Sequence, residues 1–572
     1  MRVSVLQRLY RTLAAPDTPA SHIVVEPVVE TGEVHTRFSL LSDRIRSYFV
    51  LAGLEPPATA DLTLTVYDGD GRARHREVIA GHAIGAPFVW DSRARLRGLA
   101  APVEGTAAVE TVLYDRGGAR VPEALIEAAY GHKSAGLAEL YCDYYAPGRF
   151  ITTTHSNIVA KTPPPAARRA IARWVRAATR GTWTRRWRSP AHIRAGAVAV
   201  FDDGERESAL LCYTWREGTR PREIGVELRN ADGASRHASI PALAPRALRE
   251  FPLERLFPGA RAFLGGRMGN LLLERPFPLL ETNPRFYVRT RHVARPGFTV
   301  EHAAMEHTAS PTTSRAAWRA MGKGYHSPAV VLERAGVRTL LALFNVVDVA
   351  APKRYGVRLY DAAGKLVVDQ PCAAEVPPRG HALVAIRELL DAAGWPGDFT
   401  GHAEVAYTMD TEAYPDTLHH QVLYAQDGLI EGVQHSAGSW NAPRDRPEPP
   451  GVRDPQALGR LPIWAAVGVD EELSSALALT NCSHAHDYDV DAHVTVSLHA
   501  GANVVAAGDV VIPPHGLWFE PVERLFPDCA TLLRPHGGRG LALIRPRNVR
   551  TLGAQVFHVV RATGRFSSEH TL

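Results

Sequence analysis

The sequence is poor in cysteine and has no long apolar run. Its five cysteines, among 572 residues, are scattered and form no CxxC pair. This pattern argues against a disulfide framework and a thiolate zinc site, so reduced and mostly buried thiols are expected. No run reaches the ~18 apolar residues that span a bilayer, and the first residues lack the apolar core of a signal peptide. We therefore expect no transmembrane segment and a cytoplasmic protein.

Acidic residues are missing from one long stretch. Between Tyr144 and Phe201 there is no Asp or Glu, while arginine is frequent. The middle of this stretch has helical periodicity, with a basic stripe made of Arg169, Arg173, Arg176 and Arg180. Such a stripe predicts contact with a polyanion or an anionic membrane surface. The alternative is a face that packs on an acidic part of the same protein.

What the chain does contain is a repeated ending. An apolar strand, a turn with Gly, an apolar residue and a His recur in the same order at four places. The four closing histidines are His155, His302, His435 and His570. The pentapeptide Glu-Arg-Leu-Phe-Pro also occurs twice, at 254–258 and 523–527. Self-similarity of this kind predicts four copies of one structural unit.

Each unit contains short strands separated by regular turn signals. The strand at 62–67 is followed by Asp-Gly-Asp-Gly, and related strand–turn pairs occur at 226–233, 357–364 and 494–501. A Pro-Pro-x-Gly step at 377–380 and 513–516 is followed by a short helical turn. The pattern predicts an all-β fold of four tandem immunoglobulin-like antiparallel β-sandwich repeats with short helical connectors. A closed barrel per unit is the alternative.

The same signals predict the organisation of the chain. An amphipathic helix is expected at 1–20, a basic Arg/Trp connector helix at 161–190, a connector at 308–325 and a Pro-rich connector at 437–461. The four repeats are expected at 21–160, 191–307, 326–436 and 462–572. Trp318 and Trp440, which follow closing histidines, are expected to pack between adjacent repeats.

The closing histidines are the main candidates for chemistry because they occupy equivalent positions. Neutral imidazoles are common ligands of zinc, copper and iron, so a shared transition-metal site is one hypothesis. It requires the four units to close into a ring or a tight pseudo-dimer. The alternative is a structural role, in which each His bonds a backbone carbonyl at the end of its last strand.

A second ligand cluster lies near the start of the last repeat. In an extended conformation one face would carry Asp487, Asp489, Asp491 and His493, and the other Tyr488, Val490 and Ala492. The acidic face predicts either a cation site or a solvent-exposed strand face whose charge discourages pairing with another strand.

Two functional hypotheses follow. The sequence has no nucleotide-binding loop, and the histidines of Glu301–His307 have the wrong spacing for a zinc protease helix. This favours a non-catalytic binding or scaffold protein that presents its repeats to a protein or glycan partner, with no cofactor. The alternative is a metal-dependent enzyme with a site between repeats, lined by the closing histidines.

Overall fold

The computed structural model describes residues 34–42, 46–53, 59–83, 90, 92–96, 98, 104–114, 118, 138–155, 158–160, 195–213, 223–244, 246–274, 285–302, 304–305, 307–308, 324–325, 328–345, 351–410, 415–417, 420–426, 429–435, 463–483, 485–501, 503–549 and 552–571. The predicted helix at 1–20, both connectors at 161–190 and 437–461, and Trp318 and Trp440 lie outside these residues.

The described chain is built from antiparallel sheets, which confirms the all-β prediction. The last stretch, called the fourth unit, shows the arrangement most completely. Its strands are β29 (Ile463–Gly468), β30 (Leu473–Thr480), β31 (Ala492–Ala500), β32 (Asn503–Ile512), β33 (Leu517–Pro521), β34 (Arg539–Pro546), β35 (Gly553–Val560) and β36 (Phe566–His570). They form two sheets, ordered β29-β34-β31-β32 and β33-β30-β35-β36. Apolar side chains from both sheets and from helices α10 (Val522–Leu525) and α11 (Cys529–Leu533) share one core.

The second unit has the same strand order. Its elements are β9 (Ala195–Val200), β10 (Arg206–Tyr213), β11 (Ile224–Arg229), β12 (Ser235–Ile240), β13 (Leu248–Pro252), α6 (Leu253–Leu256), α7 (Ala260–Leu264), β14 (Gly269–Glu274), β15 (Arg285–His292), β16 (Phe298–His302), β17 (Ala304–Met305) and β18 (His307–Thr308). The sheets run β12-β11-β14-β9-β17 and β13-β10-β15-β16.

The third unit repeats this order again. It contains β19 (Gly324–Tyr325), β20 (Ala329–Glu333), β21 (Val337–Phe344), β22 (Lys353–Asp361), β23 (Leu366–Val376), β24 (His381–Ala385), α9 (Ile386–Ala392), β25 (Phe399–Met409), β26 (Pro415–Thr417), β27 (Gln421–Gln426) and β28 (Leu429–His435). One sheet runs β19-β25-β22-β23, with β20 also paired to β25, and the other runs β24-β21-β27-β28.

The first unit is the most divergent, as its sequence indicates. It contains β1 (Val34–Ser42), β2 (Arg46–Gly53), β3 (Thr59–Asp68), β4 (Ala73–Ala83), α2 (Ser92–Leu96), β5 (Glu104–Tyr114), β6 (Ala138–Ala146), β7 (Phe150–His155) and β8 (Ile158–Ala160). Its sheets run β4-β3-β5-β1-β8 and β2-β6-β7, so among the described residues the second sheet lacks the outermost strand found in the other units.

The sheets of each unit remain open, which excludes a closed barrel per unit for the described strands. Their order also differs from that of an immunoglobulin domain, in which the first two strands pair. Here β29 and β30 lie in different sheets, as do β9 and β10. The resemblance to an immunoglobulin domain is therefore one of layers and not of connectivity.

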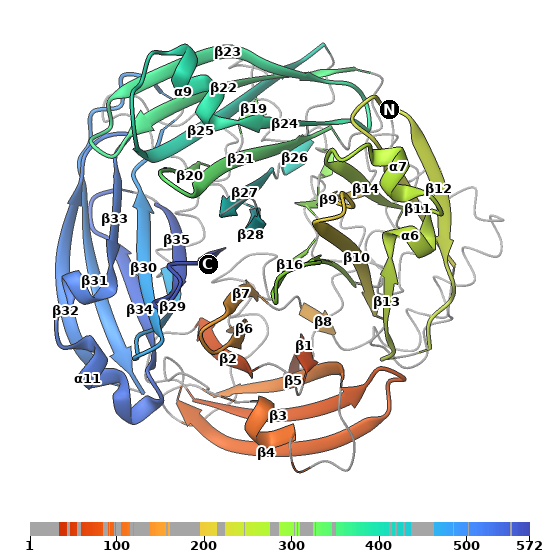
Figure 1. The fold of residues 1–572 in the computed structure, drawn as a ribbon. Helices are drawn as coiled ribbons and strands as arrows, with labels where there is room; N and C mark the ends of the chain where they lie inside the picture. The colour runs from red at the N-terminus through yellow and green to blue at the C-terminus, as the bar shows by residue number, and fades with distance from the viewer. Residues whose placement is uncertain are drawn as a thin grey trace, which may run out of the picture.

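The four units follow one another around a ring (Figure 1). At each contact between neighbouring units, called a seam, a sheet of one unit packs on a sheet of the next. Between the second and third units, Ala199 and Leu272 share a core with Phe344 and Leu423. The last seam joins the fourth unit to the first through a cluster of Tyr145, Ile151, Leu473 and Val560. The ring is therefore closed by apolar contacts between units that are far apart in sequence.

None of the helices in the described part of the chain has the length and apolarity needed to cross a bilayer.

Candidate functional site on the ring axis

The strands that end in the four closing histidines meet at the centre of the ring. These strands are β7, β16, β28 and β36, and each contacts the next around a cycle (Figure 1). Each is the last strand of its sheet and pairs with the strand before it in the same register. The partners are Tyr141 with His155, Tyr287 with His302, Gln421 with His435, and Gln555 with His570. The histidines therefore hold equivalent backbone positions around one axis.

Of these four histidines, only His570 has a described side chain. It is buried, and its Nδ1 lies 3.3 Å from the carbonyl oxygen of Thr571. Its Nε2 lies 3.5 Å from Oε1 of Glu569, which is also buried. The Nδ1 contact is a local one, to the next residue along the chain. It also leaves Nε2 as the nitrogen that would face a cation.

Side-chain hydroxyls cover the inner edges of the closing strands. The backbone N–H of Thr153 donates to Oγ of Ser567 at 2.9 Å, and the N–H of Val300 donates to Oγ1 of Thr152 at 3.3 Å. In both pairs the donor stands two residues before its closing His and the acceptor three residues before the His of the neighbouring unit. The equivalence of these bonds shows that β7, β16 and β36 are related by rotation about the axis.

The third unit has Gly432 at the acceptor position, which offers no hydroxyl. A different residue covers the edge of β36 there. Gln426 donates from Nε2 to the carbonyl oxygen of Phe566 at 2.8 Å, and its Oε1 accepts the N–H of Phe566 at 3.1 Å. One amide side chain thus replaces a sheet neighbour for both backbone groups of Phe566. An open strand edge would otherwise be a site for unwanted pairing.

A second recurring device lies at three of the seams. The described residues other than glycine with positive φ are Arg246, Arg379 and His515, with φ of 63°, 60° and 55°. Each precedes a strand that begins the second sheet of its unit, β13, β24 or β33. A left-handed backbone costs a non-glycine residue about 1–3 kcal/mol. These positions hold side chains because the side chains reach the preceding unit, and we call them seam keys.

The three seam keys use different chemistry. The guanidinium of Arg246 lies over the ring of Tyr67, 4.8 Å from its centroid. Arg379 forms an ion pair with the buried Glu227 through Nη2, and its Nε donates to Oε2 of Glu227 at 2.9 Å. The third key, His515, pairs with the buried Glu404. Each seam therefore carries its own pair of complementary groups.

His515 joins the fourth unit to the third. Its Nδ1 lies 3.1 Å from Oε1 of the buried Glu404, and its Nε2 lies 3.1 Å from the carbonyl oxygen of Ala485. Its ring stacks on Tyr360, which also stacks on the buried His402 at 5.3 Å between centroids. Two imidazoles and a tyrosine thus enclose one carboxylate inside the seam.

Electrostatics at these seams favours the charged carboxylates. Burial acts to raise the pKa of Glu227, but hydrogen bonds and charges from Arg229 and Arg379 outweigh it and lower the pKa. Burial likewise opposes ionisation of Glu404, and the two imidazoles outweigh it, so its pKa is also lowered. Both acids are therefore held as carboxylates by groups that belong partly to the next unit.

One serine–histidine pair has the geometry of a nucleophile and its base. Oγ of Ser475 lies 2.8 Å from Nδ1 of His558, and both residues are buried. Oγ of Ser475 also donates to the carbonyl oxygen of Gly468 at 3.0 Å and accepts its N–H at 2.8 Å. The hydroxyl therefore ties β30 to the end of β29.

Equivalent positions in other units show what this hydroxyl does. In the second unit, Ser208 Oγ accepts the N–H of Phe201 at 2.9 Å and lies 2.8 Å from Thr290 Oγ1. In the third unit, Thr339 Oγ1 makes the same pair of backbone bonds to Leu332, each at 2.9 Å. A hydroxyl recurs at this place while its partner changes from Thr to His. The Ser475–His558 pair is thus a structural tie.

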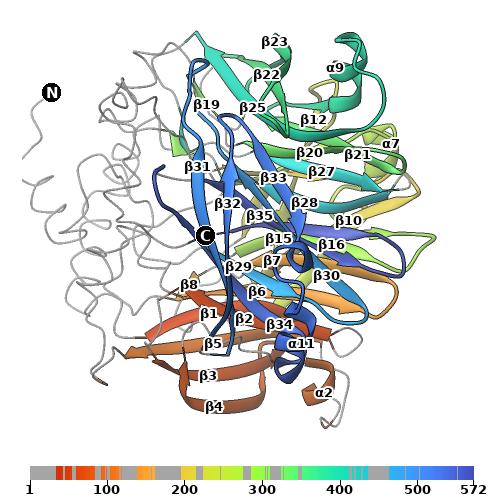
Figure 2. The same ribbon diagram turned by 90° about the vertical axis from the view of Figure 1, so that its left-hand side faces the viewer.

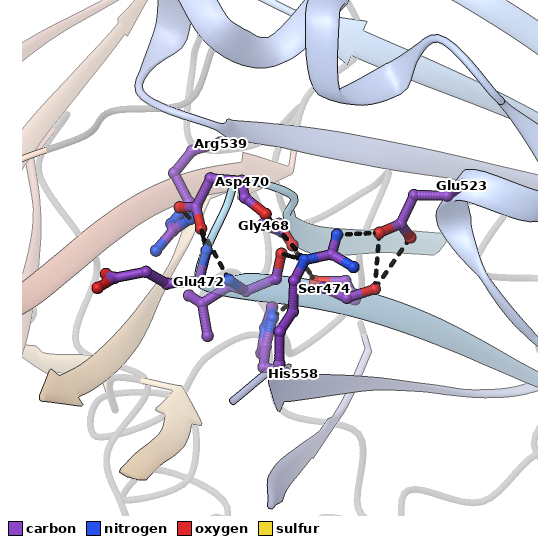
Figure 3. A network of polar contacts seen from close by, with 10 residues as sticks. Gly468, Asp470, Glu472, Ser474, Glu523, Arg539 and His558 are labelled. Atoms are coloured by element: carbon purple, nitrogen blue, oxygen red, sulfur yellow. Dashed lines mark hydrogen bonds and ion pairs between the residues drawn. The ribbon is translucent and has the colours of Figure 1, made fainter. Parts of the chain in front are cut away.

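Acidic residues around this tie link the fourth unit to the first. Oδ1 of Asp470 accepts the N–H groups of Glu472 and Leu473 at 2.8 Å and 2.7 Å, which forms the turn before β30 (Figure 3). The hydroxyl of Tyr145, in the first unit, donates to Oε2 of Glu472 at 2.7 Å. Arg539 is almost fully buried and contacts Asp470 at 3.1 Å. These groups stabilise the seam that closes the ring.

The predicted acidic cluster lies on an exposed face of the fourth unit. Asp487, Asp489, Asp491 and His493 are exposed, whereas Tyr488, Val490 and Ala492 are buried, in the alternation expected from the sequence. Arg169, Arg173, Arg176 and Arg180 lie outside the described residues. Among the residues whose side chains are described, no three of His, Cys, Asp and Glu are placed to hold a metal ion.

Sequence reasoning missed the seam keys and the hydroxyls on the axis. For Arg379 and His515 the available signal was the residue before Gly in each Pro-Pro-x-Gly step, where a large side chain stands at a turn. Arg246 lies in Ala-Pro-Arg-Ala and has no such signal. Comparison with protein-family models, curated proteins and solved structures found no match, so the site is interpreted from this chain alone.

Proposed function

We propose that the protein is a non-catalytic scaffold made of four tandem β-sandwich repeats, immunoglobulin-like in their layering, that presents its outer rim to a protein or glycan partner. Two features support a structural design. The serine–histidine pair that resembles a catalytic dyad is a tie between strands, and the inner strand edges are covered by neighbouring units. A cytoplasmic location is part of the proposal, since the described cysteines Cys212, Cys482 and Cys529 are buried thiols.

The observation that carries the proposal is the outer edge of the fourth unit. β32 is a ten-residue strand at the end of its sheet, and Asp509 is its only charged residue. The side chains of Val504 and Val511 are 58% and 56% exposed. An open, apolar strand edge can accept an extended peptide through backbone hydrogen bonds.

The outer strands of the other units carry protective features. β4 has two register shifts and two arginines, and β23 has two register shifts and Pro371, whereas β32 has one register shift, no proline and no arginine. β12 is only six residues long. Because bulges, proline, charge and short length all discourage strand addition, β32 is the edge best suited to a partner.

A selection experiment tests this proposal. The full-length protein would be screened against a library of extended peptides and against a glycan array, with Val511→Lys as the test variant. Lysine on an edge strand should weaken binding of a selected peptide by at least about tenfold, which corresponds to about 1.4 kcal/mol. Val78→Lys, on exposed β4, is the matched control and should bind normally. Binding to glycans only, or equal peptide binding by both variants, would overturn the proposal that the partner binds at β32.

A second candidate is a metal-dependent enzyme with its site on the axis. The observation in its favour is the cyclic contact of the four strands that end in closing histidines. A double-mutant cycle on His302→Ala and His570→Ala, with and without EDTA, separates the two candidates. Independent structural histidines predict additive losses of roughly 1–2 kcal/mol each and no effect of EDTA. A shared metal predicts strong non-additivity that EDTA removes, together with near-stoichiometric metal in elemental analysis.

A further inference from the structure

Arginines gather on the turn side of the ring axis, opposite to the end where the closing strands finish. The turns between β6 and β7 and between β15 and β16 lie on one face of the ring (Figure 2), and the turn between β35 and β36 holds the equivalent place in the fourth unit. They carry Arg149, Arg295 and Arg565, which come from the first, second and fourth units. Three units thus contribute a cation to the same end of the axis.

A buried histidine lies beneath these turns. His292 ends β15 and is 7% exposed. Gly297 separates it from the first unit, because a Cβ at Gly297 would lie 3.6 Å from both His292 Cδ2 and Phe150 Cγ. Phe150 directly follows Arg149 in the chain and packs on Phe298, with ring centroids 5.2 Å apart. The imidazole therefore sits where the first and second units meet at the axis.

The surroundings of His292 are cationic. Burial and the charges of Arg206, Arg565 and Arg295 lower the pKa of His292 to about 4. No carboxylate is among the main charges that act on it. Arg206 is neutralised by Asp203, with an Nε to Oδ2 distance of 2.8 Å.

Several polar groups at this place lack partners. The backbone of Ile430 raises the pKa of His292, whereas the arginines lower it. Neither ring nitrogen of His292 has a hydrogen bond of good geometry to a described residue. The exposed guanidinium groups of Arg149 and Arg295 have no ion-pair partner within the described ranges. Buried polar groups without partners are uncommon and call for a ligand or a water molecule.

We propose that this end of the axis is a binding site for a tetrahedral oxyanion, held by Arg149, Arg295 and Arg565 with His292 donating from below. The planar fork of a guanidinium matches phosphate and sulfate oxygens. An anion would add negative charge beside these arginines, and it would allow the imidazole to keep a proton. The ligand is free phosphate or sulfate, or such a group on a larger molecule. This inference does not depend on the scaffold function.

Calorimetric titration of the full-length protein with inorganic phosphate, at constant ionic strength, tests the site. The double variant Arg149→Gln/Arg295→Gln should weaken saturable phosphate binding at least about tenfold, or about 1.4 kcal/mol. The control is Arg72→Gln/Arg354→Gln, which removes the same charge from exposed arginines that are paired with Asp70 and Asp410. It should bind phosphate as the wild type does.

Nuclear magnetic resonance of the imidazoles gives an independent readout. Saturating phosphate should raise the pKa of His292 from about 4 toward the ordinary value of 6.5. A parallel titration with a sulfated disaccharide separates the sources. Binding of inorganic phosphate supports a free anion, and binding of the disaccharide alone supports an anionic group on a larger ligand. The proposal is overturned if neither ligand saturates, or if the double variant and the control bind equally.

Discussion

The ring of His515 stacks on the ring of Tyr360, with centroids 4.5 Å apart and planes within 8° of parallel. The two residues belong to different units, and His515 has a left-handed backbone to make this contact. The same backbone position holds Arg379 one seam earlier and Arg246 one seam before that. The same turn geometry therefore occurs at three seams, and the side chain determines which residue of the neighbouring unit is contacted.

Substitutions at Arg379 should separate the contact from the backbone strain. Arg379→Ala removes the bond to Glu227 and keeps a side chain in a left-handed conformation, so we expect a loss of about 1–3 kcal/mol, with Arg229 still pairing the carboxylate. Arg379→Gly removes the same bond but relieves the strain, and should be more stable than the alanine variant by about 1 kcal/mol. Urea denaturation measures both. Equal midpoints for the two variants would show that the strain is negligible.

The hydroxyl of Thr152 should protect a backbone amide of the second unit. Thr152→Val removes the acceptor for the N–H of Val300 and should cost about 1 kcal/mol, with faster amide exchange at Val300. Thr154→Val is the matched control on the same strand, because Oγ1 of Thr154 has no hydrogen-bond partner among the described residues. Hydrogen exchange followed by mass spectrometry distinguishes the two. Unchanged exchange in Thr152→Val would contradict the proposed role of the hydroxyl.

The seam between the third and fourth units should be sensitive to acid. Burial lowers the pKa of His402 below its ordinary 6.5, so the unfolded chain takes up a proton first as the pH falls. The free energy of unfolding should therefore be greatest above about pH 6.5 and decrease below it. Glu404, whose pKa is also lowered, should add a further loss below its ordinary 4.5.

Denaturation at a series of pH values tests this expectation. His402→Gln should flatten the dependence below about pH 6.5, because the buried imidazole that resists protonation is gone. His493→Gln is the control, since His493 is exposed and lies outside the seam. If His493→Gln removed the dependence of the unfolding free energy on pH and His402→Gln did not, that dependence would not come from the buried imidazole of His402.

Ser475 should be unreactive in the folded protein. Its hydroxyl is buried and bonded to both backbone groups of Gly468, so a fluorophosphonate probe should not label it. Ser475→Ala should lose about 1–3 kcal/mol, because two backbone groups of Gly468 and His558 lose a partner. Stoichiometric labelling of Ser475 in the native state would revive a catalytic role.

Much of the local structure could be predicted from the sequence. The Asp68–Gly71 turn, the helical turns at Leu253 and Val522, and the strand at Leu477–Asn481 follow from turn chemistry and periodicity, and the structure places a turn, α6, α10 and β30 there. These features depend on neighbours in the chain. Because the units repeat, each local prediction could be transferred from one unit to the next.

The ring and its axis could not be predicted in this way. Closure depends on the rotation between successive units, which is set by side-chain packing across seams such as Phe344 against Leu272. His292 and Arg149 lie far apart in sequence and show no shared pattern. The Thr152 hydroxyl is likewise one of three consecutive threonines, and only the position of the neighbouring unit distinguishes it.

The mutual covering of the inner strand edges has a consequence for misfolding. Because Thr152, Ser567 and Gln426 each cover an edge that belongs to another unit, parting one seam uncovers sheet edges that the intact ring hides. A ring that opens briefly is therefore prone to aggregate, even while every unit keeps its own core. Resistance to aggregation in this protein should follow the strength of its weakest seam more closely than the stability of any single unit.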